Sequence, residues 1–399
     1  MSEVKLGDIG KISMCKRILK SQTNEVSGIP FYKISTFGGI ADVFIDEAIF
    51  HEYKEKYSYP KKGDILISAA GTVGKTVIYT GEDAYFQDSN IVWIDNNEKI
   101  VTNQYLYYFY QTNPFVSTNG STIKRLYNDN IRETKIKNVP SIEAQNKVTK
   151  VLEYLDQKIA INNQINEELE AMAKTLYDYW FVQFDFPDEN GKPYKSSGGK
   201  MVYNDQLKRE IPEGWGVKLL GEICNIVMGQ SPSGTSYNEI GEGIVFYQGS
   251  TDFGWRYPNV RQFTTAPTRY ANENDILLSV RAPVGTLNIA NETCCIGRGL
   301  AAINSKSGYN SFLFQQMQLY KKEFQLRDAT GTTFGSITKD DLFSLSMVIA
   351  SENLMKRYEN IVGKSYDKIK ILSKQNKELT QLRDWLLPML MNGQVKVEE

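Results

Sequence analysis

The residue types that carry most nucleophilic, acid–base and metal chemistry are scarce in this chain. Its 399 residues include one histidine, His51, and four cysteines, at Cys15, Cys224, Cys294 and Cys295. No CxxC pair occurs, so a zinc site of the usual spacing is excluded and reduced thiols are expected. No GxSxG nucleophile motif is present, and the carboxylates are spread at ordinary density. We therefore expect no catalytic residue, no metal and no cofactor.

Two short motifs resemble those of enzymes. AAGTVGKT (Ala69–Thr76) fits a loose phosphate-loop pattern, in which glycine amides, a lysine and a threonine hold phosphates and magnesium. A related segment later in the chain, SVRAPVGTL (Ser279–Leu287), keeps the turn but lacks the lysine. A loop that survives duplication without its lysine indicates a feature of the fold, so nucleotide hydrolysis is the third alternative only.

TNPFV (Thr112–Val116) is the nearest approach to the NPPY motif of adenine methyltransferases. It lacks the second proline, and no GxGxG cofactor loop precedes it. The sequence therefore does not predict a methyltransferase.

The charge balance limits the kind of partner that this chain binds alone. Lys and Arg number 46 and Asp and Glu 47, which gives a formal net charge of −1. Autonomous nucleic-acid-binding domains are usually basic, because neutralising phosphates supplies much of the affinity. Neutrality leaves room for a locally basic groove or for binding together with a partner. The chain has neither a signal-peptide core nor an apolar run of about 18 residues, so we expect a cytoplasmic protein.

The sequence repeats itself at long range. Leu66, Ser68 and Gly74 fall opposite Leu277, Ser279 and Gly285, an offset of 211 (277−66, 285−74). The matching segments are LGDIGKI (Leu6–Ile12) with LGEICNI (Leu220–Ile226), FYKISTFGG (Phe31–Gly39) with FYQGSTDFG (Phe246–Gly254), GDILISAAGTVGKTVIY (Gly63–Tyr79) with NDILLSVRAPVGTLNIA (Asn274–Ala290), and NGSTIKRLYNDNI (Asn119–Ile131) with TGTTFGSITKDDL (Thr330–Leu342). Such a long period indicates domain duplication rather than a solenoid. The β-branched and aromatic runs within each half predict short strands and loops.

Each half ends in a long amphipathic segment with alternating spacings of four and three residues. The positions predicted to form a shared seam are Leu155, Ile159, Asn166, Leu169 and Leu176 in the first segment, and Ile369, Leu372, Asn376, Leu379 and Leu386 in the second. This period is typical of a coiled coil, in which a polar Asn fixes the register. We expect two antiparallel helices of about 40 residues, each about 60 Å long. The alternative is that each helix packs on its own domain.

The predicted fold class is α+β, with two β-rich globular domains in tandem repeat separated by two long antiparallel coiled-coil helices. The expected boundaries are 1–140 and 216–350 for the domains, 141–184 for the central helix and 351–392 for the C-terminal helix. Residues 185–215 are rich in Gly, Pro, Ser and charge and are interpreted as a linker.

This organisation resembles the specificity (S) subunit of type I restriction-modification systems. The residues that carry the resemblance are WFVQFDFPDENGKPYKSSGGKM (Trp180–Met201) with IPEGW (Ile211–Trp215), the GDIL…GTVGK stretch, and VGTLNIA followed by GRGLAAI (Gly297–Ile303). The resemblance covers essentially the whole chain. It implies two target-recognition domains, each reading half of a split site in double-stranded DNA, and a helical spacer that docks two methyltransferase subunits. Methylation and restriction would belong to those partners and to the restriction-translocase subunits.

Residues that contact DNA are expected in the loops that the two halves share, because polar and basic side chains read base edges and hold phosphates. The first half offers Lys33, Ser35, Thr36, Thr72, Lys75, Ser121, Thr122, Lys124 and Arg125, and the second half offers Gln248, Ser250, Thr251, Arg281, Arg298, Thr332 and Thr333. For each of them, a solvated loop side chain is the alternative. Arg298 has a buried structural ion pair as a further alternative.

The main competing function is a coiled-coil scaffold that binds protein and not DNA. The neutral charge favours it, whereas two diverged copies of a loop-rich domain do not. Basic side chains along one groove in each half would indicate DNA, and a large apolar patch there would indicate a protein partner.

Overall fold

The computed structural model describes residues 3–115, 125–329, 336–395 and 397. Contacts divide the chain into two units, Met1–Ile161 with Gln375–Glu399 and Asn162–Lys374. No helix in the described part of the chain is both long enough and apolar enough to cross a membrane.

The first unit contains two four-stranded sheets. One is antiparallel in the order β2–β9–β6–β7, formed by β2 (Gly10–Ser13), β9 (Ile91–Asn96), β6 (Ile65–Ser68) and β7 (Thr76–Ile78). The other has the order β3–β5–β4–β8, formed by β3 (Thr23–Asn24), β5 (Phe44–Ile45), β4 (Ile29–Tyr32) and β8 (Tyr85–Phe86). Its β4 and β8 are parallel. The pair β1 (Val4–Lys5) and β10 (Lys135–Ile136) is separate.

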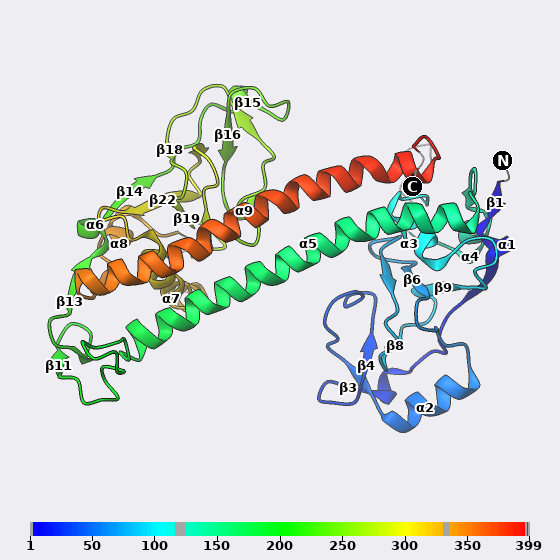
Figure 1. Cartoon of the computed structure of the whole chain (residues 1–399), viewed down its shortest axis with the longest axis horizontal. Coiled ribbons are helices and arrows are strands. Elements are labelled where there is room, and N and C mark those ends of the chain that lie inside the picture. The colour runs from blue at the N-terminus through cyan, green and yellow to red at the C-terminus, as the bar shows by residue number, and fades with distance from the viewer. Residues whose placement is uncertain (1–2, 116–124, 330–335, 396, 398–399) are drawn as a thin grey trace. The chain divides into compact units, whose positions relative to one another are not determined.

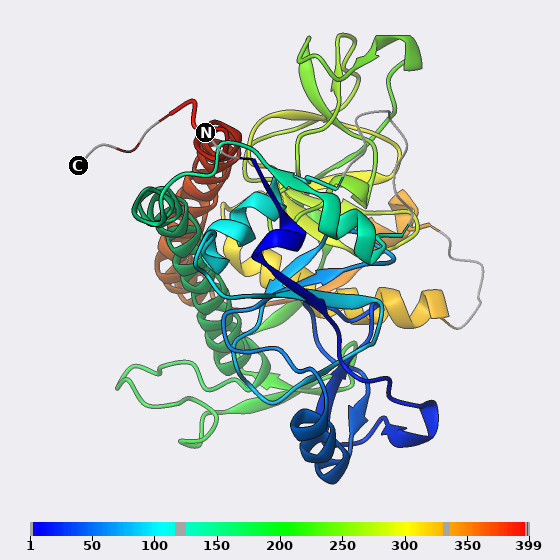
Figure 2. The same cartoon turned by 90° about the vertical axis from the view of Figure 1, so that its right-hand side faces the viewer.

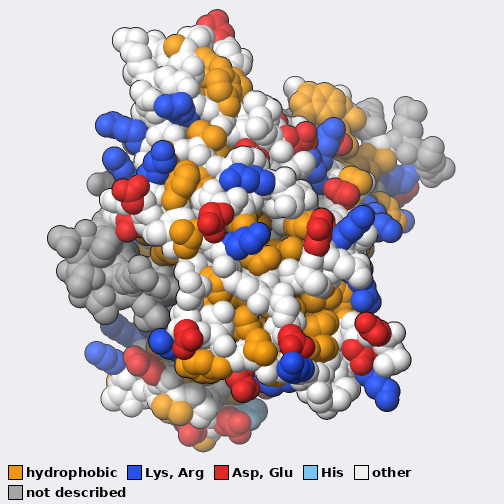
Figure 3. Space-filling view, turned by 90° about the vertical axis from the view of Figure 1, so that its left-hand side faces the viewer, with side chains coloured by type: hydrophobic (Ala, Val, Ile, Leu, Met, Phe, Trp, Pro, Cys, Tyr) orange, Lys and Arg blue, Asp and Glu red, His pale blue; other side chains and the backbone are white. Residues whose placement is uncertain are grey.

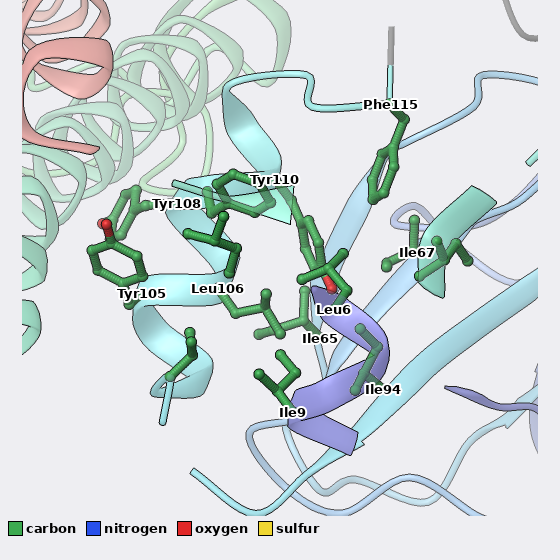
Figure 4. Packing of buried hydrophobic residues seen from close by; sticks show 14 of the residues in the cluster. Leu6, Ile9, Ile65, Ile67, Ile94, Tyr105, Leu106, Tyr108, Tyr110 and Phe115 are labelled. Carbon is green, nitrogen blue, oxygen red and sulfur yellow. The ribbon is translucent and has the colours of Figure 1, made fainter. Parts of the chain in front are cut away.

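Short helices cover these sheets of the first unit. They are α1 (Leu6–Ile9), α2 (Glu47–Lys56), α3 (Asn103–Gln111) and α4 (Asn128–Glu133). Figure 4 shows Leu106 and Tyr110 of α3 facing Leu6 of α1 and Ile65 of β6, all fully buried. The strand β6 is an unbroken run of buried residues, which is typical of a strand covered on both faces.

The second unit repeats this design. Its first sheet, β14–β22–β19–β20, is formed by β14 (Cys224–Met228), β22 (Leu300–Ser305), β19 (Ile276–Ser279) and β20 (Leu287–Ile289). Its second sheet, β15–β17–β16–β21–β18, is formed by β15 (Tyr237–Asn238), β17 (Phe263–Thr264), β16 (Ile244–Tyr247), β21 (Cys294–Ile296) and β18 (Tyr270–Ala271), with β16 and β21 parallel. The pair β13 (Gly216–Leu219) and β23 (Ser346–Ile349) matches β1 and β10.

The helices of the second unit also match, with α6 (Leu220–Ile223), α7 (Asn310–Ala329) and α8 (Lys339–Phe343) in the places of α1, α3 and α4. The strand order is the same through the first four strands of each sheet. The halves differ where the first unit has α2 and the second has β18. The predicted duplication of an α+β domain is therefore confirmed.

Two long helices run beside each other, α5 (Ile142–Tyr177) and α9 (Glu352–Met391), and both views show them side by side (Figures 1 and 2). In the first unit the Arg383 guanidinium pairs with Asp156 at 2.8 Å, and the Asn376 amide reaches the Ile159 carbonyl at 3.5 Å. In the second unit Asn166 contacts Ser373 at 3.5 Å. Residue numbers rise along α5 as they fall along α9, so the pair is antiparallel, as predicted.

The positions predicted to form the seam are buried to different depths. Asn166, Ile369 and Leu372 are buried. The other predicted seam positions are half-buried: Leu155, Ile159, Leu169, Leu176, Asn376, Leu379 and Leu386. A buried Asn at such a position costs stability and favours one register, because a slipped pairing would leave its amide among apolar side chains.

Each sheet domain contacts the long helices at the start of one of its own helices. In the first unit the Gln145 side chain of α5 accepts from the Thr102 amide at the start of α3 and donates to the Ile100 carbonyl, both at 2.8 Å. In the second unit the Glu359 carboxylate of α9 accepts from the Ser311 amide, at the start of α7, at 3.0 Å. Both side chains satisfy backbone groups that a helix terminus leaves without partners.

The segment predicted as a linker is folded. The hairpin β11 (Met201–Asn204) and β12 (Arg209–Pro212) lies within it. Phe186 stacks on Tyr194 and on Trp215, with ring centroids 4.6 and 5.4 Å apart. These aromatic residues give a Gly- and Pro-rich segment an apolar cluster of its own, which composition alone conceals.

We expect Ile369→Ala in α9 to lower the free energy of unfolding by about 2–5 kcal/mol, because it opens a cavity in the helix pair. Ile371→Ala is the matched control, since Ile369 is 0% exposed and Ile371 is 62% exposed on the same helix. Urea unfolding of the isolated chain measures both. Equal losses for the two variants would contradict the paired arrangement.

Candidate nucleic-acid interface

The loop after β6 and the loop after β19 are built in the same way. The Ser68 hydroxyl accepts from the Lys75 amide at 2.9 Å and donates to the Thr72 carbonyl. At an offset of 211 (279−68), the Ser279 hydroxyl accepts from the Thr286 amide at 3.0 Å and donates to the Pro283 carbonyl. One serine hydroxyl therefore fixes the turn in each unit.

This geometry decides how the GTVGK motif is interpreted. The loop leads from β6 into another strand, β7, and not into a helix whose N-terminal amides would cradle a phosphate. The Lys75 ammonium donates to the Phe37 carbonyl at 2.5 Å. The motif is a strand-to-strand turn, in agreement with the prediction that it belongs to the fold.

Lys75 also ties two candidate DNA loops together in the first unit. Its Nζ holds residues 33–39, and Gly38 (φ +71°) makes the approach possible, since a Cβ there would lie 3.0 Å from the lysine Cε. In the same loop Lys33 pairs with Asp42 at 3.1 Å. Thr36 caps its own turn through the Lys33 backbone, and Ser35 and Thr72 are exposed. Lys33 and Lys75 thus have internal partners that DNA would have to compete with.

The corresponding loops of the second unit meet around a surface pocket of about 220 Å³. Its lining is Gly249, Ser250, Thr251, Arg281, Ala282, Pro283 and Gly299. Backbone bonds hold the loops in place, from the Gly299 amide to the Gln248 carbonyl at 3.1 Å and from the Val280 amide to the Gly299 carbonyl at 2.8 Å. The structure therefore brings most of the described candidates of this half to one place.

Arg281 and Arg298 are both exposed beside this pocket, which removes the alternative of a buried ion pair for Arg298. The backbone amide of Arg298 donates to the Ser231 hydroxyl at 3.3 Å. The loop that holds Ser231 follows β14 and was not anticipated from the sequence. The feature that marks this loop is the close approach of Gly229 to the Gly297 carbonyl, since a Cβ on Gly229 would lie 2.2 Å from that oxygen. This approach is visible only in the tertiary structure.

A third loop reaches each site. The Leu126 amide donates to the Ala69 carbonyl and the Ile337 amide to the Val280 carbonyl, both at 2.8 Å and again 211 residues apart (337−126). Arg125, beside Leu126, is exposed and lies over the Tyr127 ring. The other candidates of these loops lie outside the described residues: Ser121, Thr122, Lys124, Thr332 and Thr333.

The chemistry of the buried thiols differs from that of a nucleophile. All four cysteines are free and buried. Burial raises the pKa of Cys15, Cys224 and Cys294 to about 12, so these groups stay protonated at neutral pH. No cluster of metal-binding side chains occurs within the described ranges.

Charges of both signs are interspersed on the face seen in Figure 3. No broad patch of one sign is visible there.

Comparison with known proteins gives a consistent result. The model of the type I restriction modification DNA specificity domain matches residues 1–171 and 212–381, most of the chain. The chain belongs to this specificity domain family. A putative type I restriction enzyme MjaX specificity subunit from Methanocaldococcus jannaschii is 32% identical over 401 residues, covering 94% of this chain and 89% of that protein.

Two further relatives extend the comparison. A putative type I restriction enzyme specificity subunit from Haemophilus influenzae is 50% identical over 180 residues, which is 44% of this chain and 46% of that protein, less than half of either. The crystal structure of a type I restriction-modification system S subunit from M. genitalium matches with a TM-score of 0.61 and 15% sequence identity. The match covers 98% of this chain and 95% of that one, so the two chains share a fold. The predicted family, with two specificity domains in tandem, is confirmed.

We expect Ser279→Ala to loosen the β19–β20 turn of the second specificity domain, because the Thr286 amide loses its acceptor. Loss of one such bond costs about 1–3 kcal/mol where the group stays buried. Hydrogen exchange should show a faster amide at Thr286 and an unchanged amide at Lys75, and Ser68→Ala should do the reverse. Unchanged exchange in both variants would contradict the role given to the serines.

Proposed function

We propose that this chain is the DNA-reading subunit of a type I restriction-modification enzyme and that its two domains read the two halves of an asymmetric site in double-stranded DNA. One observation carries the proposal: the two units share one loop scaffold but differ in the side chains on it. Ala70 stands where the second unit has Arg281, and Lys75 stands where it has Thr286. Two loops with the same turn but different hydrogen-bond donors and acceptors on their side chains are suited to reading two different base sequences.

The domain boundaries follow from this proposal. Residues 1–140 and 216–350 are the exchangeable readers, and 141–184 and 351–392 are the spacer that separates them. The segment 185–215 joins the first helix to the second domain. Paired helices suit a fixed separation of half-sites better than a flexible linker does, because a linker samples many lengths.

The helices also provide a surface for partners. Ile161 and Ile371 are 52% and 62% exposed, and Met172 and Leu382 are 66% and 43% exposed; each pair is 210 residues apart (371−161, 382−172). Exposed apolar side chains repeated in this way suit two copies of one partner. We infer that two methyltransferase subunits dock there and bring the restriction-translocase subunits with them.

The net charge of −1 fits this assignment, since DNA would be held by the complex rather than by this chain alone. Four reduced, buried thiols suit the cytoplasm, where the proposal places the protein. The alternative of a scaffold that binds only protein has no support from the family to which the chain belongs.

Exchanging residues 1–140 with those of another specificity subunit tests the modular reading. In complexes with the methyltransferase, sequencing of methylated adenines should show a change in one half of the target and an unchanged second half. A change in both halves, or in neither, would refute independent domains.

Arg281→Ala should weaken discrimination at one position of the second half-site by about 1–3 kcal/mol, because a bidentate arginine contact to a base is worth that much. The matched control Lys33→Ala should affect the first half-site only. Competition binding of the complex to single-base variants measures both. Uniform weakening across all variants would assign Arg281 to a phosphate instead.

Ile161→Asp and Ile371→Asp should each weaken the binding of one methyltransferase copy, because a carboxylate would be desolvated in an apolar contact. Native mass spectrometry of the complex should show loss of one partner in each single variant and of both partners in the double variant. Full assembly of the double variant would exclude these positions from the docking surface.

A further inference from the structure

The loop of residues 248–262 connects β16 to β17 and carries three of the candidate DNA contacts at its start, Gln248, Ser250 and Thr251. The two arms of this loop are hydrogen-bonded to each other. The Asn259 amide donates to the Asp252 carbonyl at 2.8 Å, a backbone bond that joins the two arms of the loop. A displacement of the far end of the loop is therefore transmitted to its reading end.

Arg256 lies at that far end and leaves the domain to contact the long helices. Its side chain is only 4% exposed and forms an ion pair with Glu170 of α5. Its guanidinium carbon lies 3.8 Å from the ring centroid of Tyr366 on α9 and 4.6 Å from that of Phe314 on α7. One side chain thus touches three helices of the second unit.

The backbone of Arg256 is equally well fixed. The Ile289 amide of β20 donates to its carbonyl at 2.9 Å, and the Asn288 side chain donates to the Gly254 carbonyl at 3.0 Å. β20 is the strand that leaves the Ser279 turn. Arg256 therefore connects the helix pair to two of the segments that line the candidate DNA pocket, residues 249–251 and the turn after β19.

Stability alone does not explain a charge in this position. Burial raises the pKa of the Glu170 carboxyl, and the neighbouring guanidinium opposes that rise, so desolvation outweighs the attraction. Buried ion pairs can often be replaced by apolar residues without loss of stability. An ion pair and a stacked guanidinium instead fix the orientation of the loop relative to the helices, because both interactions depend on angle as well as distance.

Close packing does not hold the loop here by itself. Arg256 and Tyr366 border a surface pocket of about 390 Å³ between the domain and α9, whose lining includes Asn274, Glu359 and Gly363. A loop beside such an open pocket has room to shift when its polar anchor is removed.

We propose that Arg256 is a positioning residue: with Glu170 and Tyr366 it fixes the angle at which the second domain's reading loops stand on the helices, and thereby the number of base pairs tolerated between the two half-sites. This inference rests on the proposed reading of a two-part site. It assigns the choice of spacer length partly to a residue that touches no DNA.

The test uses the complex with the methyltransferase and duplexes that carry both native half-sites separated by the native spacer or by one base pair more or less. Wild type should methylate only the native spacer. Arg256→Met, which keeps the stem but loses the charge, should reduce discrimination between spacers by about tenfold, the size expected when strongly coupled contacts are removed. Preference for bases within each half-site should stay unchanged.

Arg261→Met is the matched control, since Arg261 lies in the same loop and is ion-paired but bonds to Asp252 rather than to a helix. It should keep the spacer discrimination of wild type. Glu170→Gln removes the same ion pair from the other side with almost no change in volume, so it decides the question if Arg256→Met fails to fold. Arg256→Lys should restore little, because an ammonium lacks the planar stacking face.

Equal loss of methylation at every spacer, with discrimination intact in Arg256→Met and Glu170→Gln, would overturn the inference and leave Arg256 a structural residue. Absence of any two-part target for the wild-type complex would instead overturn the proposed function. Thermal unfolding of each variant separates folding defects from changes in spacing.

Discussion

The antiparallel pairing of α5 with α9 is the constraint on which the other features depend. Each unit contains part of both helices, and each sheet domain rests on them through polar contacts, at Gln145 in the first unit and at Glu359 in the second. Apolar side chains supply the attraction between the helices, while the Asn166 amide and the pair of Asp156 with Arg383 favour one register. The sheets alone, with strands of two to six residues, have little surface with which to fix their own orientation.

Under the proposed function, the helix pair and the turns supply the shape of the protein, while the loop side chains supply recognition. Ser68 and Ser279 hold equivalent turns through the same pair of hydrogen bonds, so the two turns are closed in the same way. The side chains displayed there are free to differ, as Ala70 and Arg281 do. If these loops read DNA as proposed, one domain can change its specificity without altering the packing beneath it, because the serine hydroxyl and the glycine hold the turn.

Several features could be predicted from the sequence because they arise from neighbouring residues or from a repeated pattern. The duplication appears as an offset of 211 between Ser68 and Ser279, and the helices appear as a seam that recurs every three or four residues. Other features were not legible, because they depend on residues far apart in the chain. The ordered aromatic cluster of Phe186 and Trp215 lies in a segment whose composition is typical of a linker. Likewise, the partner of Lys75 is a carbonyl 38 residues away, and no local pattern encodes it.

The sequence by itself determined the family, the two-fold repeat, the pairing of the long helices and the set of loops that form the candidate interface. All of these depend on hydrophobic periodicity, glycine-bearing turns and internal similarity, which are properties of neighbouring residues. Only the tertiary structure decided which candidates meet at one pocket, which lysines are held by internal partners, and that the buried guanidinium of Arg256 joins the loop of residues 248–262 to both long helices. The reason is physical: side-chain contacts between distant segments depend on how the sheets and helices pack together. The order of residues in one sequence does not show which distant residues will be in contact.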